Sequence, residues 1–232
     1  MRTTLDTGFT DLILEFTGNA GISLTESQAQ LLSLHIRLLI QWNSRLNLTR
    51  ITATQQIIVK HLLDSIVPAK FLPSSGNCLD VGTGAGFPGI PMKIVNPELQ
   101  TILLDSSRKK VSFLATVAAT LGLKGIRAVH GRWENFTQAE ENVEKFQLIT
   151  MRAVRLEPEH ITSMASTALA PGGRFASWGG PGELGGNGCE GRNPFAEKSS
   201  EIEFLGAFSY PLPGIERQRA VWIWRKNPNS PI

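Results

Sequence analysis

The sequence predicts an α/β protein with a mostly parallel sheet, preceded by a helical N-terminal region. Apolar residues recur at three- and four-residue spacings over residues 11–70, whereas short apolar runs alternate with helical stretches beyond residue 76. Such alternation is typical of strand–helix–strand units with parallel strands. The last two strand-like runs are joined too closely for a crossover helix, which indicates an antiparallel hairpin. We therefore expect a helical region over 1–70 and an α/β domain over 71–232.

The composition is that of an ordinary globular protein, with 41% hydrophobic and 19% charged residues in a chain of 232. No apolar run is long enough to cross a bilayer, and the N-terminus lacks the pattern of a signal peptide. Two distant cysteines and four scattered histidines give neither a disulfide framework nor a metal-ligand spacing. We expect a cytoplasmic protein without a metal. Its net charge of +3 is compatible with a nucleic-acid partner.

Two helices are expected in the N-terminal region. The first covers residues 24–43 (LTESQAQLLSLHIRLLIQWN), where apolar residues recur on one face. Ser23 or Thr25 can cap its N-terminus, with Glu26 and Gln28 close behind. A second helix is expected over residues 54–68.

The rest of the chain predicts seven strands and three helices. The strands are expected over residues 77–81, 100–105, 125–130, 146–154, 172–178, 201–210 and 219–226. The helices are expected over residues 88–95, 107–123 and 158–170. The polar, glycine-rich segment 179–200 is expected to form a loop.

A glycine-rich loop, LDVGTGAGFPGIP (79–91), follows the first predicted strand. Gly82, Gly84 and Gly86 would let the backbone adopt positive φ and approach a ligand closely. The loop lies at the carboxyl end of a strand, where open α/β sheets bind ligands. We therefore expect a nucleotide-like ligand, with a tight turn that binds nothing as the alternative.

The loop matches two cofactor signatures in different registers. DVGTGAG, beginning at Asp80, has the DxGxGxG form typical of S-adenosylmethionine (SAM) sites, whereas GAGFPG (84–89) matches the dinucleotide fingerprint GxGxxG. In the second register Phe87 and Pro88 would lie beside the pyrophosphate, and a proline lacks the N–H that an anion binds. The sequence therefore favours SAM over NAD.

Further candidate residues follow the next strands. Asp105 ends the second, where a carboxylate accepts the hydroxyl groups of a cofactor ribose, and it could equally cap the following helix. Trp133 and Glu134 follow the third, where the adenine edge would lie, although Trp133 could be an ordinary half-buried aromatic.

Arg152 ends the fourth predicted strand, in MRAV. This segment is not the (N/D)PP(Y/F) motif of adenine N-methyltransferases, and no strand-end cysteine is placed for cytosine C5 methylation. Guanine N7 is an acceptor that needs neither the motif nor the cysteine, because its lone pair attacks directly and no proton has to leave. The rate would then depend on alignment and electrostatics, for which Arg152 is the catalytic candidate.

Four blocks of the chain resemble the GidB family of bacterial ribosomal RNA methyltransferases. They are QWNSRLNLTRI (41–51), HLLDSIV (61–67), LDVGTGAGFPGIPMKIVNP (79–97) and LLDSSRKKVSFL (103–114), with weaker matches at GRWENF and MRAV. The resemblance implies a class I SAM-dependent methyltransferase fold, which is Rossmann-like. It also implies methylation of guanine N7 in the 530 loop of 16S rRNA, within the 30S subunit or an assembly intermediate. A monomer is expected.

The resemblance also implies roles for particular residues. Gly82 and Phe87 would contact SAM from the loop, Trp133 and Glu134 would contact the adenine, and Arg152 would lie beside the methionine end and the acceptor base. A second group would link the helical region to the catalytic face, chiefly through capping and hydrogen bonds: His61, Asp64 and Ser65.

The chain departs from the family pattern at three places, one of which is the unusually glycine-rich loop after the fifth predicted strand. Gln147 replaces an aspartate, and Trp178–Gly179 stands where the family has a lysine–glycine pair, which removes a cation from the active-site rim. Candidates for phosphate contacts are Arg45, Arg50, Lys60, Arg108, Lys109 and Lys110. The alternative function is SAM-dependent methylation of another RNA or of a small molecule.

Overall fold

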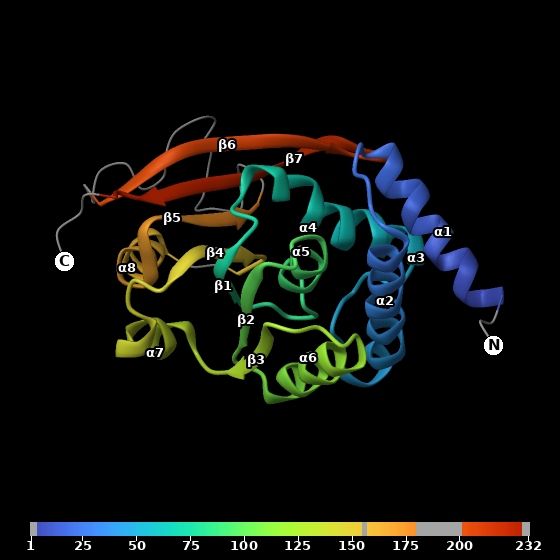
Figure 1. Ribbon diagram of the computed structural model, residues 1–232, viewed down its shortest axis with the longest axis horizontal. Helices are drawn as coiled ribbons and strands as arrows, with labels where there is room; N and C mark the ends of the chain where they lie inside the picture. Colours follow the sequence, from blue (N-terminus) through green and yellow to red (C-terminus); the bar gives the residue numbers. More distant parts are fainter. Residues whose placement is uncertain (1–3, 155–156, 180–200, 229–232) are drawn as a thin grey trace.

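The computed structural model describes residues 4–154, 157–179 and 201–228. The expected loop 179–200 therefore falls outside the described residues beyond Gly179. One seven-stranded sheet forms the centre, with helices on both faces (Figure 1). The strand order is β3-β2-β1-β4-β5-β7-β6. Because the order reverses beside β1, the loops after β1 and β4 flank the switch point where such sheets bind ligands.

All seven predicted strands are present. Their bounds are β1 Gly76–Val81, β2 Leu99–Asp105, β3 Ile126–His130, β4 Phe146–Arg152, β5 Leu169–Trp178, β6 Ile202–Leu212 and β7 Ile215–Lys226. The pairs among β1 to β5 are parallel, and β7 pairs antiparallel with both β5 and β6. The predicted C-terminal hairpin at the sheet edge is thus confirmed.

The helices lie between these strands and before them. Their bounds are α1 Thr4–Asn19, α2 Glu26–Leu46, α3 Thr54–Ile57, α4 Asp64–Ile66, α5 Gly89–Val95, α6 Arg108–Thr120, α7 Trp133–Gln138 and α8 Pro158–Ala168. A π-helical turn, η1 Ile58–Leu63, joins α3 to α4, and short 3-10 turns follow as η2 Val67–Phe71 and η3 Glu140–Asn142.

Alternate residues of the strands enter two separate cores. Cys78 and Leu103 belong to one core with α1 to α6, whereas Leu79 and Leu104 belong to the other with α8. This alternation follows from the two-residue repeat of a strand, whose successive side chains point to opposite faces. The sheet is therefore buried on both faces.

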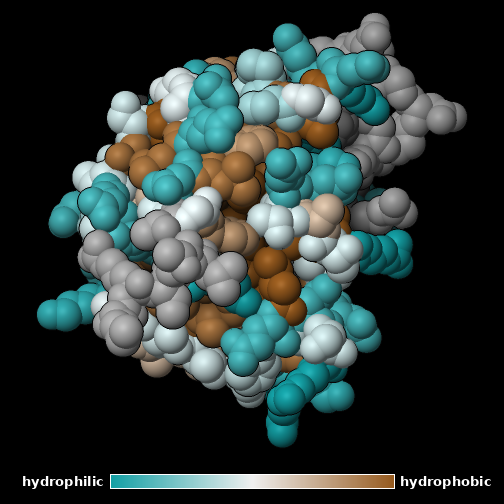
Figure 2. Space-filling model, turned by 90° about the vertical axis from the view of Figure 1, so that its right-hand side faces the viewer, coloured by the Kyte–Doolittle hydropathy of each residue, from teal (hydrophilic) through white to brown (hydrophobic). Residues whose placement is uncertain are grey.

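The N-terminal region shares the first core. Ile13 of α1 and Leu32, Ile36 and Leu39 of α2 are fully buried in the same cluster as the strand residues. The boundary near residue 70 is a change in secondary structure, and the hydrophobic core runs across it. Viewed from the side of α1 and α2, apolar side chains also gather on the surface between hydrophilic ones (Figure 2).

The N-terminal cap of α2 forms as the sequence predicts. The Thr25 hydroxyl accepts from the Gln28 N–H at 3.2 Å, and the Gln28 side chain accepts from the Thr25 N–H at 2.9 Å. The C-terminal cap of the helix is Asn47, whose left-handed conformation (φ 49°) ends the helix.

Three features differ in detail from what the sequence predicts. The helix over 54–68 contains the π turn η1, and β5 begins at Leu169, inside the predicted helix 158–170. The hairpin connection is shorter than expected because Gly214 takes φ +69° and lets Leu212 pair directly with Ile215. No helix in the described ranges is long and apolar enough to cross a membrane.

Candidate active site

The glycine loop adopts the backbone conformation that the sequence predicts. Gly82, Gly84 and Gly86 have φ of +65°, +61° and +91°. A Cβ at Gly82 would collide with the Val154 side chain, and one at Gly86 would collide with Ile90. The loop therefore requires glycine for conformation and, at these two positions, for space as well.

Asp80 supports this loop from within the core. Its carboxylate accepts from the Gly89 N–H at 2.9 Å and from the Thr150 hydroxyl at 2.8 Å, and the residue is fully buried. Burial raises the pKa of Asp80 to about 6, although these hydrogen bonds oppose the rise. Asp80 thus ties the loop to α5 and β4.

A cavity of about 490 Å³ lies beside the loop, at the carboxyl ends of β1, β2 and β3; we call it the cofactor cavity. Its lining residues are Val81, Gly82, Leu104, Asp105, Ser106, Lys110, Gly131, Arg132, Trp133, Glu134, Ala153 and Val154. Four of the predicted cofactor residues therefore line one cavity. The other five do not line it: Asp80, Gly84, Gly86, Phe87 and Arg152.

The capping role considered for Asp105 was wrong, because the N-cap residue of α6 is Ser107. One carboxylate oxygen accepts from the Ser107 N–H at 2.8 Å, and the other accepts from the Gly84 N–H at 3.0 Å. The Lys110 ammonium lies 3.8 Å from the second oxygen. Asp105 thus joins the glycine loop to α6 while facing the cavity.

Glu134 offers an acceptor to a ligand in the cofactor cavity. Its Oε2 atom is buried and has no hydrogen-bond partner in the structure. Its Oε1 atom lies 4.0 Å from the Arg132 guanidinium. A buried carboxylate oxygen without a donor is costly, so this atom fits a ligand that brings its own hydroxyl or amino group.

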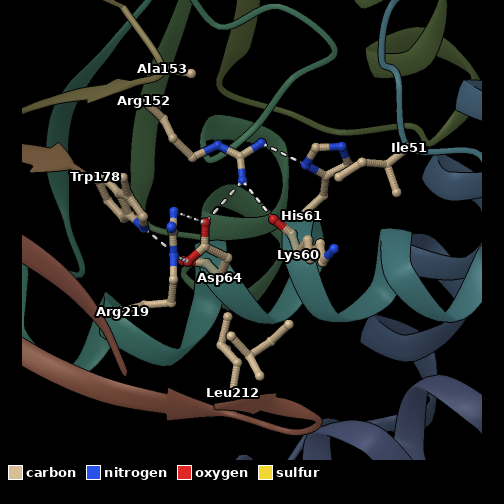
Figure 3. Close-up of a pocket in the computed structure, with 10 residues that line it drawn as sticks. Ile51, Lys60, His61, Asp64, Arg152, Ala153, Trp178, Leu212 and Arg219 are labelled. Atoms are coloured by element: carbon tan, nitrogen blue, oxygen red, sulfur yellow. Dashed lines mark hydrogen bonds and ion pairs between the residues drawn. The ribbon is translucent and has the colours of Figure 1, made fainter. Parts of the chain in front are cut away.

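A second cavity, of about 310 Å³, meets the first at Ala153; we call it the acceptor cavity (Figure 3). It lies between β4, the helix that contains η1 and α4, and the C-terminal hairpin. Its lining residues are Ile51, Lys60, His61, Asp64, Arg152, Ala153, Trp178, Leu212, Ile215 and Arg219.

Arg152 reaches from the end of β4 across the acceptor cavity (Figure 3). Its guanidinium donates to the Asp64 carboxylate at 3.3 Å, to the Lys60 carbonyl at 3.2 Å and to His61 Nδ1 at 3.0 Å. It also lies over the Phe87 ring, 5.4 Å from the centroid. Burial lowers the pKa of Arg152 and the Asp64 carboxylate opposes this, so the group keeps its charge.

Asp64 is the centre of this network. Besides Arg152, its carboxylate accepts from the Tyr210 hydroxyl at 2.8 Å and from Arg219 Nε at 3.2 Å. Its carbonyl oxygen accepts from the Trp178 indole at 2.6 Å. Only 2% of the Asp64 side chain is exposed. Asp64 thus joins the helical region to β4 and the hairpin through its carboxylate, and to β5 through its carbonyl.

The network also fixes His61 in its neutral form. Nδ1 accepts from Arg152, so the ring proton lies on Nε2, which is 2.9 Å from the Thr49 hydroxyl. Burial and the neighbouring Arg152 charge lower the pKa of His61 to about 3. The Ser65 hydroxyl donates to the His61 carbonyl, so the predicted linking residues do come together.

Phe87 lies between two histidines instead of lining the cofactor cavity. Its ring centroid is 4.7 Å from His35 and 5.1 Å from His61, with nearly parallel planes. His35 Nε2 is 2.9 Å from the Ala85 carbonyl in the glycine loop. The helical region therefore touches both the cofactor loop and Arg152 through this stack.

We expect stability to fall as the pH decreases below 6.5. Burial lowers the pKa of His35 to about 4 and that of His61 to about 3, so the unfolded chain takes up these protons first. The loss is on the order of 1 kcal/mol per pH unit for each histidine. Asp80 opposes part of it, because its raised pKa lets the folded state take up a proton below about pH 6.

Thermal unfolding of wild type and His61→Gln between pH 7 and pH 5 checks this expectation. The difference in unfolding free energy between the two proteins isolates His61 from Asp80 and from the other titrating groups. We expect the difference to shrink towards pH 5. A difference that stays constant with pH would show that His61 is not held neutral.

Several residues of the site were not predicted from the sequence. Thr49, Tyr210 and Arg219 were not foreseen as site residues, although Tyr210 is the single tyrosine of the chain. Trp178, which stands in place of the family's lysine, lines the acceptor cavity, where Lys60 and Arg219 supply cations. Gln147, which stands in place of the family's aspartate, lines neither cavity. Its side chain accepts from the Asn77 N–H near the start of β1.

The candidate phosphate contacts are scattered around the two cavities. Lys60 lines the acceptor cavity and Lys110 lines the cofactor cavity. The other four line neither cavity and are exposed: Arg45, Arg50, Arg108 and Lys109.

The sheet order, the glycine loop after β1 and the acidic residue at the end of β2 define a class I methyltransferase. Solved structures share this fold. P. horikoshii TYW2 in complex with MeSAdo is 13% identical, with a TM-score of 0.53 over 73% of this chain and 63% of that one. A mutant form of MtNAS has the same TM-score and identity over 98% of this chain and 90% of that one.

The chain belongs to the GidB family, described as rRNA small subunit methyltransferase G, whose family model matches residues 28–183. It is 47% identical to ribosomal RNA small subunit methyltransferase G 1 of Syntrophobacter fumaroxidans, over 90% of this chain and 93% of the relative. It is 37% identical to the methyltransferase G of Desulforamulus reducens, over 90% and 86%. The resemblance found in the four sequence blocks is confirmed.

Proposed function

We propose that this protein transfers the methyl group of SAM to N7 of a guanine in the 530 loop of 16S rRNA. The observation that carries the proposal is the pair of cavities that meet at Ala153. One offers acceptors suited to a nucleoside, and the other is lined by cations and apolar side chains. A donor and an acceptor base held in the two would face one another across this junction. Family membership supports the same activity.

The cofactor cavity would hold SAM through Gly82, Asp105, Trp133 and Glu134. The Asp105 carboxylate faces the place of the ribose, and the unpartnered Glu134 oxygen can accept a hydroxyl or amino group. When bound, SAM supplies an electrophilic methyl group on a sulfonium. The glycine loop carries no basic side chain, which suits a ligand without phosphates better than NAD.

The acceptor cavity suits a displacement without a general base. His61 and Asp64 are the groups with basic atoms there, and both already accept from Arg152. Guanine N7 needs no base, because its lone pair bonds to the methyl group and the positive charge passes to the purine. Arg152 would therefore act by orienting the base and by fixing the electrostatics at the junction.

Glu134→Ala tests the cofactor assignment. We expect SAM affinity to fall at least tenfold, because hydrogen bonds to a charged group contribute about 1.5–3 kcal/mol. The unfolding temperature should not fall, since Oε2 has no partner to lose. Calorimetry with SAM and with NAD measures this. The exposed Glu140→Ala variant is the matched control, and tight NAD binding without SAM binding would overturn the cofactor assignment.

The substrate is tested with labelled SAM on 30S subunits from a strain that lacks the enzyme, with naked 16S rRNA alongside. We expect label in the 16S rRNA of the subunit or of an assembly intermediate. Label in another RNA would favour the first alternative. An absence of label in any RNA, with transfer to small acceptors, would favour the second.

We further propose that the enzyme acts in the cytoplasm as a monomer, which sedimentation at working concentration can check.

A further inference from the structure

The hydrogen-bond acceptors that line the acceptor cavity are already in use. The two Asp64 carboxylate oxygens accept from Arg152, Tyr210 and Arg219, at distances of 2.8 to 3.3 Å. His61 Nδ1 accepts from Arg152 at 3.0 Å. The Lys60 carbonyl accepts from the same guanidinium at 3.2 Å. A ligand that enters this cavity therefore meets acceptors that are satisfied by protein donors.

The charged side-chain donors that line the cavity are three cations. Arg152 and Arg219 converge on Asp64 from β4 and β7, and Lys60 is exposed at the rim (Figure 3). The remaining walls include four apolar or aromatic side chains: Ile51, Trp178, Leu212 and Ile215. Such walls suit the faces of a planar base, and the three cations suit an edge that carries acceptors.

The volume of the acceptor cavity fits a single base. Its size of about 310 Å³ lies at the lower end of the range for small-ligand pockets, about 300–1,000 Å³. The N7 edge of a purine in an RNA helix lies in a deep and narrow groove that side chains do not reach. An enzyme that modifies N7 must therefore receive the base unstacked from its neighbours.

We propose that the acceptor cavity takes one unstacked purine and selects guanine over adenine through the group at C6. This inference rests on the proposed function. The N7 edge of guanine presents two acceptors, N7 and O6, whereas that of adenine presents N7 and an amino donor. With N7 near Ala153, the C6 group lies on the same edge of the base and would meet the cations that line the cavity. The O6 of guanine receives a hydrogen bond there, whereas the amino group of adenine meets donors and a saturated carboxylate.

Substituted target nucleotides test this selection without altering the protein. We would reconstitute 30S subunits whose 16S rRNA carries guanosine, inosine or 2,6-diaminopurine at the target position. All three bases keep N7. Inosine keeps O6 and lacks the 2-amino group, whereas 2,6-diaminopurine keeps the 2-amino group and replaces O6 with an amino donor.

We expect inosine to be methylated within about tenfold of guanosine and 2,6-diaminopurine to react at least a hundredfold more slowly. Comparable rates for 2,6-diaminopurine and guanosine would overturn the inference. So would an inosine as poor as 2,6-diaminopurine, because the opposite edge of the base would then be the one recognised. Failure to methylate guanosine subunits would instead overturn the proposed function, and this inference with it.

A variant of Lys60 tests whether this lysine is the donor that binds O6 of the base. In Lys60→Met we expect the guanosine rate to fall about tenfold while the 2,6-diaminopurine rate and SAM affinity stay unchanged. The matched control is Lys124→Met, which removes an exposed lysine that lines neither cavity and is not a candidate for phosphate contact. An equal fall for both bases would show that Lys60 contacts phosphate and does not read the base.

Discussion

Replacing Arg152 by alanine should reduce methyl transfer by at least about a thousandfold while the protein stays folded. The guanidinium joins the acceptor cavity to Asp64, His61 and Phe87, and removal of one preorganised electrostatic group costs about 10²–10³ in rate. Loss of orientation at the junction adds to this. Single-turnover transfer to 30S subunits measures the rate, and calorimetry should show SAM still bound.

Arg174→Ala is the matched control for that variant. Arg174 also ties the helical region to the sheet, because its guanidinium donates to the Phe71 carbonyl at 2.7 Å. It lines neither cavity, so we expect transfer to remain near the wild-type rate. Full activity in Arg152→Ala would remove Arg152 from the site. A loss in Arg174→Ala equal to that in Arg152→Ala would point to a general structural role for the contacts between helices and sheet.

Asp64→Ala should destabilise the protein by about 3–5 kcal/mol and abolish transfer. The carboxylate is 2% exposed and pairs with Arg152, whose side chain is 13% exposed, so its removal takes the counter-charge from a mostly buried cation. The Tyr210 hydroxyl loses its acceptor in the same variant. Chemical denaturation measures the loss, and hydrogen exchange should show that β6 and β7 become less protected.

Two further variants calibrate the Asp64 result. Tyr210→Phe removes one hydrogen bond and should cost about 1 kcal/mol. Glu203→Gln breaks the exposed pair with Arg225 and should cost at most about 1 kcal/mol. If Asp64→Ala were no more destabilising than Glu203→Gln, Asp64 would not be the centre of the network.

Local signals explain what the sequence could predict. The alternation of apolar runs and helical stretches located all seven strands, and the Thr25–Gln28 capping box placed the start of α2. The loop after β1 revealed its conformation because glycine adopts the positive φ of Gly82 and Gly84 without strain. These features depend on residues that are close together in the chain.

The features that could not be predicted depend on distant contacts or on small changes in helical geometry. Tyr210 and Arg219 meet Asp64 across 146 and 155 residues, and nothing in a local pattern specifies that meeting. The π turn η1 retains the apolar spacing of an ordinary helix, so periodicity does not reveal it. His35 has the sequence context of a core residue, and its contact with Ala85 follows only from tertiary packing.

The most direct test of the proposed methylation is the chemical identity and position of the product in 16S rRNA. Subunits treated with enzyme and SAM would be probed with borohydride and aniline, which cleave RNA at 7-methylguanosine, and the nucleosides would be separated by mass. We predict one new cleavage, in the 530 loop, and one new nucleoside, 7-methylguanosine. Methylation at another atom, or at a position outside that loop, would contradict the proposed function.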